Sequence, residues 1–523
     1  MDTPGHITKG TVIASNFTSY DHSILPPWHA LLAKEWHEQK WRAATLTIAL
    51  LLFVFFASGD SNSDLVANFQ FAAWLIGSAG ALFIAIKCAV GERNEGSIGF
   101  LLSLPIERWK IGIAHILVSA FLCVAPLLVT ALILQIILLL SGQSAQSTPL
   151  WTATVVSLGG CLALFFWITA TTLDQPTELR AAALGITVIV LWAIIGVLLP
   201  PASPAYQPFG LAEVILGIGP AGWWRMNTVP VHPPDPGIVV WSLIGFSLLA
   251  ALIIGNYGRP PRPSLPSLHL KWRGGLRKPY RRPGIALVVM HLRELLPIVS
   301  IGILSLVAWS AFLLHYQASE DIHLPQTLEF VTTASSAIGV FLMVATVVYT
   351  FVPSLEPNLM SFWRSRPIPP DEWFWSKYSI CLLVSLTLIH TPTTLIIGTG
   401  TKIAWFDCSS EIVACLCLCL MHTAIASIAV LCASLTRRTV SAAILALSTS
   451  AIIIWMPMFA GSDQNPLRFD FAREQLRSFA QSGFQATSYH DLQFLPFLSL
   501  MAFIAVTASW IAAWAFRHDF SLQ

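Results

Sequence analysis

The stretch GERNEGSIGFLLSLPIERWK, residues 91–110, is a polar interval between two long apolar runs, and it is called the first loop below. Such an interval is expected outside the hydrocarbon core of a membrane, because charged side chains are costly to bury in lipid. Charged residues open it, the apolar run from Ile98 to Leu104 follows, and Pro105 comes next. This run is too short to span a bilayer. The pattern therefore predicts a short amphipathic helix at the membrane surface that ends before Pro105.

The order and spacing of the first loop resemble the first cytoplasmic loop of ABC-2 type transporter permeases. In that family, an E-R-x-x-G-S/T lead-in and an L-x-S-L-P-I/V-x-R-W tail form the coupling helix, which contacts the ATPase subunit. A plainer interpretation of the same pattern is an ordinary interfacial helix that stops at a proline. The resemblance implies that the residues contacting the ATPase are Glu92, Arg93, Glu95, Phe100, Leu101, Pro105, Glu107, Arg108 and Trp109.

Composition places the rest of the chain in a membrane as well, since 55% of the 523 residues are hydrophobic and 11% are charged. Residues 26–42 are amphipathic and predict a helix lying flat in the interface, with Trp28, Leu31, Leu32 and Trp36 on one face. Apolar segments that can cross ~30 Å of hydrocarbon follow. In the first half they cover residues 43–59, 67–90, 111–140, 150–173, 181–201 and 237–257.

Residues 202–236 interrupt this series with a segment rich in Gly and Pro. The segment is too broken to span a membrane, which favours a half-inserted external structure. The resemblance to ABC-2 permeases likewise implies re-entrant external helices between the fifth and sixth spans.

The pattern of the first half recurs later in the chain. Further apolar segments cover residues 298–315, 329–353, 379–399, 412–434, 439–460 and 494–516. A constant offset of 262 residues relates Phe100, Ser103, Pro105 and Ile106 to Phe362, Ser365, Pro367 and Ile368. An offset of half the chain length predicts an internal repeat.

The repeat places a second loop at residues 362–373, between two apolar segments, with Glu356 a few residues before it. It lacks the acidic lead-in of the first loop, so unequal contact of the two loops with an ATPase is expected. The residues that the resemblance implies for this contact are Glu356, Phe362, Arg364, Arg366, Pro367 and Trp373.

The sequence therefore predicts an all-α integral membrane protein of twelve transmembrane helices, arranged as two parallel six-helix repeats. The resemblance makes this architecture similar to ABC-2, or type V, exporters, with two permease halves fused in one chain. The first half, with its interfacial helix, is expected at residues 1–257 and the second at residues 285–523. Residues 258–284 between them predict a basic cytoplasmic linker rich in Pro and Gly.

The distribution of Lys and Arg predicts the orientation. With the N-terminus inside, cytoplasmic segments and their flanks hold 24 of the 29 Lys and Arg residues. The positive-inside rule then predicts both termini on the cytoplasmic side of the plasma (inner) membrane. Each half has an even number of expected spans, so both halves have the same orientation. This disfavours transporter folds built from inverted repeats.

Sequence signatures of catalysis are missing. No phosphate-binding sequence G-x-x-x-x-G-K-S/T occurs, so the chain is not expected to be an enzyme. ATP and Mg²⁺ would belong to separate ATPase subunits, of which the resemblance implies two copies. No metal site is predicted, because the nine Cys are interpreted as small packing residues in apolar spans. His115, His390 and His422 occur singly and favour hydrogen-bonded helix contacts.

The resemblance implies a membrane-spanning permease subunit of an ATP-binding cassette transporter, an exporter that is driven by separate ATPase subunits and surrounded by lipid. The alternative is an ion-coupled secondary transporter or a membrane scaffold without transport. Ion coupling usually needs an ionisable residue within a span, and none lies near the midpoint of an expected span. The basic linker fits an anionic membrane surface better than nucleic acid.

Overall fold

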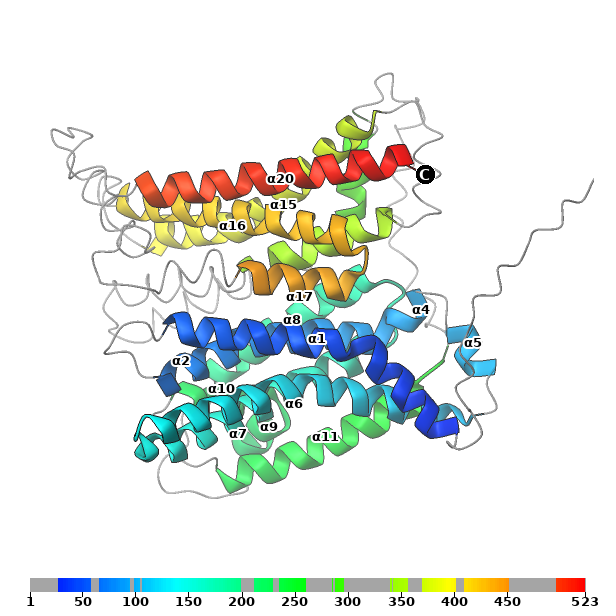
Figure 1. Cartoon of the computed structure of the whole chain (residues 1–523), viewed down its shortest axis with the longest axis vertical. Helices are drawn as coiled ribbons and strands as arrows, with labels where there is room; N and C mark the ends of the chain where they lie inside the picture. The colour runs from blue at the N-terminus through cyan, green and yellow to red at the C-terminus, as the bar shows by residue number, and fades with distance from the viewer. Residues whose placement is uncertain are drawn as a thin grey trace, which may run out of the picture.

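The computed structural model describes the chain in separate stretches. They are residues 27–57, 65–94, 98–103, 106–198, 211–228, 235–259, 285, 287–295, 339–340, 342–355, 369–400, 409–450 and 495–522. All regular secondary structure in them is helical, and the long helices lie in layers (Figure 1). The all-helical class expected from the sequence is confirmed.

The first half contains long helices joined by short helical pieces. Its second span is a continuous run in which two π-helical segments, η1 and η2, alternate with α-helix. The elements are α1 (Pro27–Ala57), α2 (Leu65–Ala72), η1 (Ala73–Gly77), α3 (Ser78–Ile86), η2 (Lys87–Gly91), α4 (Glu92–Asn94), α5 (Ile98–Ser103), α6 (Arg108–Leu140), η3 (Ser144–Gln146), α7 (Ser147–Thr172), α8 (Glu178–Leu198), α9 (Leu211–Ile218), α10 (Pro220–Thr228) and α11 (Pro236–Asn256).

Helix α1 joins the expected interfacial helix and the first apolar segment without a break, and Figure 1 shows its first turns bending away from the remainder. Leu31, Glu35 and Gln39 are buried, at a spacing of four residues, whereas Trp36 is 40% exposed. The face that packs on the protein is therefore partly polar. Of the apolar face expected to lie in the membrane interface, Leu31 is buried in the protein and Trp36 is exposed.

Helix α3 lies at the centre of the first half and contacts α6, α7 and α8. Every residue from Ala79 to Ile86 is buried. Gly80 permits this close packing, because a Cβ added there would lie 3.1 Å from a methyl carbon of Leu46 on α1. Small residues at such crossings let helices approach closely in a membrane.

Short paired helices, α9 and α10, stand where the sequence predicts a broken external segment. Trp223 of α10 lies flat on α7, where a Cβ at Gly159 would fall 2.4 Å from its ring. The indole of Trp223 donates a hydrogen bond of 2.8 Å to Ser242 of α11, and the Ser242 hydroxyl donates to the Gly217 carbonyl at 2.6 Å. These contacts hold the pair between α7 and α11.

The second half is described over helical residues 287–295, the helix Leu342–Ser354, and four labelled helices. These are α15 (Pro370–Gly400), α16 (Ser409–Thr436), α17 (Thr439–Ser450) and α20 (Leu495–Leu522). Helix α16 packs against both α17 and α20, and α15 packs against α16 and α20.

The two parts of the chain meet along α17. Figure 1 shows α17 between α16 and the layer that contains α1 and α8, and it contacts both α1 and α3. Phe83 of α3 also stacks on Tyr349, with ring centroids 6.2 Å apart. The seam between the two parts is therefore apolar and closely packed.

Among the described residues, six helical runs are long and apolar enough to cross a membrane. They are Leu65–Gly91, Arg108–Leu140, Ser144–Thr172, Pro236–Asn256, Leu416–Thr436 and Leu495–His518. All six coincide with expected spans. Shorter apolar helices, Arg180–Trp192, Leu342–Ser354 and Thr439–Ser450, overlap three other expected spans. Residues 43–57 of the first expected span lie in α1 and the expected span 379–399 lies in α15, whereas residues 58–59 and 298–315 are outside the described part of the chain.

Candidate functional site

The first loop is fastened to the ends of two long helices by Arg93. Its guanidinium donates hydrogen bonds to the carbonyls of Leu173 at 3.0 Å and Gln175 at 3.2 Å, which follow the end of α7. It also donates to the Arg259 carbonyl at 3.0 Å, just after α11. A guanidinium placed here satisfies carbonyls beyond helix ends and complements the negative ends of two helix dipoles. Arg93 thus ties the loop to α7 and α11.

Helix α5 of the first loop is fastened by Leu101. This side chain is 1% exposed and packs in a small cluster at the cytoplasmic ends expected for α1, α6 and α11. Gly99 and Ser103 of the same helix are exposed. One side of α5 is therefore held against the protein and another is open. The other buried members of the cluster are Leu31, Ile111, Ala114 and Tyr257.

The end of the first loop presents charged and aromatic side chains at the start of α6. Glu107, Arg108 and Trp109 are exposed, Trp109 by 49%. Lys110 lies 3.2 Å from the carboxylate of Glu107, and its ammonium lies 5.3 Å from the ring centroid of Trp109. This exposed group is called the rim below. Such surface ion pairs contribute little to stability, which leaves the rim available for contact with a partner.

A buried polar cluster lies behind the first loop. Glu35 of α1, Glu92 of α4 and His115 of α6 are 1%, 7% and 3% exposed. The Nδ1 atom of His115 is 3.4 Å from Oε2 of Glu35. The ring of Tyr257 stacks on that of His115 with centroids 5.4 Å apart, and burial raises the pKa of the Tyr257 hydroxyl. The cluster brings together three elements that adjoin the loop.

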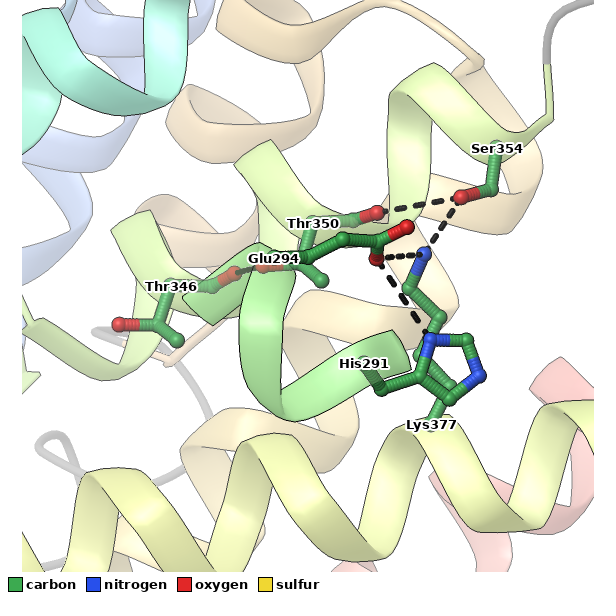
Figure 2. A network of polar contacts seen from close by, with 6 residues as sticks. All are labelled: His291, Glu294, Thr346, Thr350, Ser354 and Lys377. Carbon is green, nitrogen blue, oxygen red and sulfur yellow. Dashed lines mark hydrogen bonds and ion pairs between the residues drawn. The ribbon is translucent and has the colours of Figure 1, made fainter. Parts of the chain in front are cut away.

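The second half carries a related group, shown in Figure 2, in which His291 and Lys377 are buried and Glu294 is 42% exposed. The carboxylate of Glu294 lies between Lys377, at 3.4 Å, and the ring of His291, at 3.5 Å. The ammonium of Lys377 also donates to the hydroxyl of Ser354, which in turn donates to the Thr350 carbonyl at 3.4 Å. Lys377 thereby joins the helix 287–295, the helix Leu342–Ser354 and α15.

Environment sets the protonation of this group. Burial lowers the pKa of His291, which favours the neutral form of its ring. Burial by itself would raise the pKa of Glu294, but the contact with His291 and the charge of Lys377 outweigh it, and the pKa is lowered. The pair is therefore a carboxylate beside a buried cation, with a neutral imidazole next to it.

Trp373, which the resemblance places in the second loop's ATPase contact, is 3% exposed. Its ring stacks on Phe516 of α20 with centroids 5.0 Å apart and planes inclined by 9°. The ammonium of Lys377 lies 4.9 Å from its centroid. Trp373 is thus positioned to hold α15 and α20 together. Nearby, Arg517 and Asp371 join the same two helices through an exposed ion pair of 2.6 Å.

The remaining predicted residues are only partly described. Within the first loop, Glu95 and Pro105 and the side chain of Phe100 lie outside the described residues. The second-loop residues Glu356, Phe362, Arg364, Arg366 and Pro367 also lie outside them. Among the described site residues, Glu92, Leu101 and Trp373 are buried, whereas Glu107, Arg108 and Trp109 are exposed.

The sequence analysis does not identify Glu35, His115 and Lys377 as residues of the buried polar groups beside the two loops. The spacing Leu31, Glu35, Gln39 is a signal for a partly polar buried face on α1. Lys377 also lies 262 residues after His115, which is the offset of the repeat. Applying that offset to polar residues would have paired the two positions.

Comparison with known proteins supports the resemblance. Residues 30–203 match a family model described as ABC-2 family transporter protein. The match begins in α1, includes the whole first loop and extends beyond α8. A search of curated proteins found no match. Residues 30–203 are thus similar to the membrane domain of ABC-2 family transporters, and the described part of the chain is an all-helical membrane protein with six candidate spans.

Proposed function

We propose that this chain is the permease subunit of an ATP-binding cassette exporter driven by separate ATPase subunits. The observation that carries the proposal is the mounting of the first loop. Arg93 and Leu101 fasten it to the ends of long helices, while the rim faces outward. A segment fixed on one side and open on the other suits transmission of movement from a partner to the spans. The ABC-2 match supports an ATPase as that partner.

Both permease halves are proposed to lie in this chain, at residues 1–257 and 285–523, with twelve spans and cytoplasmic termini. Helix starts support the repeat. Helix α15 begins 262 residues after α6, at Pro370 against Arg108. Helix α16 begins 262 residues after α7, at Ser409 against Ser147. Substrate would pass along the seam where α17 meets α1 and α3.

The loop residues divide into two roles in this proposal. Arg93, Leu101 and Glu92 position the first loop. Phe100 and the rim residues Glu107, Arg108 and Trp109 contact the ATPase. In the second loop, Trp373 positions, and the contact comes from Glu356, Phe362, Arg364, Arg366 and Pro367. Closure of two ATPase subunits on ATP and Mg²⁺ moves both loops, and Arg93 passes the movement to α7 and α11.

The test is binding of purified ATPase subunits to the purified full chain, followed by transport in vesicles. Candidate ATPases are those that co-purify with the tagged chain from its own membrane and contain a phosphate-binding sequence. Replacing Arg108 and Trp109 together by Ala should weaken binding at least ~10-fold, as for loss of a central aromatic and a charge. Trp151→Ala is the matched control, since Trp151 is also an exposed aromatic near a helix start, at the other end of the bundle. Equal weakening in both variants would contradict the proposal.

The same vesicles separate the alternatives. An exporter moves substrate only when ATP is present together with both the permease chain and the ATPase subunits. Its transport continues when an ionophore removes the ion gradients. Transport by an ion-coupled carrier stops when the ionophore is added and does not depend on ATP. A scaffold gives no transport under any of these conditions. His115 and Lys377 each lie seven residues after the first residue of their helix, Arg108 and Pro370, beside the loops. This position near the helix ends favours a role in coupling over an ion pathway through the spans.

A further inference from the structure

The offset of 262 residues relates positions of opposite charge at the ends of the two loops. Lys110, in the first turn of α6, corresponds to Glu372, in the first turn of α15. The exposed indole of Trp109 corresponds to the carboxylate of Asp371. A basic and aromatic helix start in the first half thus corresponds to an acidic helix start in the second.

The acidic residues belong to an exposed group that is called the second rim, and its members are Asp371, Glu372 and Arg517. The carboxylate of Asp371 is 43% exposed and lies 2.6 Å from the guanidinium of Arg517, and Glu372 is also exposed. Two acids and one base give the second rim a net charge of −1. The rim of the first loop has two bases and one acid, and therefore a net charge of +1.

The two surfaces also differ in shape. Arg517 brings the end of α20 to the second rim, and its guanidinium is 63% exposed. The position 262 residues earlier is Gly255 of α11. A Cβ added at Gly255 would meet no other side chain or segment within 4 Å. The first half therefore has open space where the second half presents a cation.

The loop sequences before the rims differ in the same position-by-position way. Leu102 and Leu104 of the first loop correspond to Arg364 and Arg366 of the second. Apolar positions of the first loop thus correspond to basic positions of the second, and basic positions of the rim correspond to acidic ones. A partner surface that complements one loop does not complement the other.

Both rims lie on the same side of the molecule, since Figure 1 shows α5 and the C-terminal end of α20 on that side. A pair of identical ATPase subunits would present the same surface to each half, because the two copies are related by a twofold axis. Acidic groups that complement Lys110 would then face Glu372 in the other half. Like charges brought together at an interface oppose binding. Identical subunits therefore fit one half and are repelled by the other.

We propose that the two loops bind two different ATPase subunits, so that the complex holds one copy of each per chain. The subunit at the first loop has an apolar groove for α5, edged with acidic groups that face the rim. The subunit at the second loop is acidic where it faces Arg364 and Arg366 and basic where it faces the second rim. This inference rests on the proposed function, because it names the partners of the same two loops.

The composition of the purified complex is the first test. The tagged full chain is isolated from its own membrane in mild detergent, and the ATPase polypeptides that co-purify are identified and counted by mass spectrometry. We expect two different polypeptides with a phosphate-binding sequence, each at one copy per chain. A single ATPase species would support the proposed function and overturn the inference of two partners. Recovery of the chain without any ATPase would overturn both.

Charge reversal then assigns each subunit to a loop. Each purified ATPase is measured alone for binding to the purified full chain. Arg108→Glu should weaken binding of one ATPase at least ~10-fold and leave the other unchanged, and Glu372→Lys should do the converse. Glu38→Lys reverses a charge that is 49% exposed on α1, outside both rims, and should leave both unchanged.

The substituted side chains are exposed, and an unchanged melting temperature shows that each variant is folded. Weakening of the same ATPase by Arg108→Glu and Glu372→Lys would overturn the inference. An equal affinity of wild type and both variants for each ATPase would overturn it as well.

Discussion

The ammonium of Lys377 lies 3.4 Å from the carboxylate of Glu294, and the two side chains differ greatly in exposure. Lys377 is 1% exposed, whereas Glu294 is 42% exposed. A carboxylate that reaches water tolerates the loss of its partner, but a buried ammonium does not. Removing Glu294 and removing Lys377 should therefore change the stability of the protein by different amounts.

Glu294→Gln should destabilise the protein more than Lys377→Met. The first change leaves a buried, unpaired cation and should lower the free energy of unfolding by about 3 kcal/mol. The second leaves a carboxylate that hydration can stabilise, at a cost of about 1 kcal/mol. Thermal unfolding of the purified variants in one detergent measures the difference. Asp371→Asn, which breaks the exposed pair with Arg517, is the control and should cost less than either. The opposite order for Glu294 and Lys377 would show that the pair does not hold the second half in this way.

Arg93→Lys should loosen the first loop although the charge is kept. One ammonium cannot hold three carbonyls on two segments as the planar guanidinium does. Hydrogen exchange should accelerate in residues 92–94 and in the turn after α7, at least ~10-fold for the loss of about 1.5 kcal/mol of hydrogen bonding. Arg108→Lys, on the exposed rim, should leave exchange unchanged. Identical exchange rates in wild type and Arg93→Lys would show that the Arg93 guanidinium does not hold the first loop.

Leu101→Ala and Trp109→Ala should weaken ATPase binding for different reasons. Leu101 is the buried side chain of α5, so its truncation should lower the free energy of unfolding by about 2–3 kcal/mol and release α5 from the protein. Trp109 is exposed, so its truncation should weaken binding without changing the melting temperature. Unfolding and binding are measured on the same preparations. A lower melting temperature for Trp109→Ala, with Leu101→Ala unaffected, would reverse the assignment.

The first loop should carry more of the ATPase contact than the second. Phe100→Ala is expected to cost about 2 kcal/mol of binding free energy and Phe362→Ala about 1 kcal/mol, because only the first loop combines an apolar helix with an acidic lead-in that fixes its orientation. Binding of the ATPase to variants matched for expression and detergent measures both. Release of the ATPase by Phe362→Ala alone would show that the ranking is wrong.

Stability of the second half should fall on mild acidification. The pKa of His291 is lowered from 6.5 in the folded protein, so the unfolded chain binds its proton first. Its contribution is therefore complete above about pH 7 and is lost as the pH falls through 6.5 and below. Glu294, whose pKa is lowered from 4.5, loses its contribution at still lower pH.

The measurement is the melting temperature between about pH 7.5 and 5. His291→Gln should flatten this dependence, since Gln does not titrate, and His29→Gln, on the exposed side of α1, should not. If wild type and His291→Gln had parallel curves, the imidazole would not be buried as a neutral group.

Much of the architecture follows from hydropathy along the chain. Each of the six candidate spans coincides with an expected segment, and α5 ends at Ser103 before α6 begins at Arg108. These features depend only on the length and hydropathy of continuous segments of the chain. A run of apolar residues of sufficient length must be helical in lipid, because its backbone groups find no other partners there. The 262-residue offset is likewise readable without coordinates.

Only the tertiary structure shows which side chains of different segments contact one another. Periodicity placed Leu31 and Trp36 on one apolar face of α1, but it did not show that Leu31 and Glu35 are buried in the protein while Trp36 stays exposed. Trp373, expected at a partner surface, is stacked on Phe516, and Glu35 meets His115 from eighty residues away. Lipid is as apolar as leucine, so in a membrane polarity does not tell which face of a helix touches protein. The sequence by itself determined where the chain is helical, and neighbouring helices decided which side chains of each helix are enclosed.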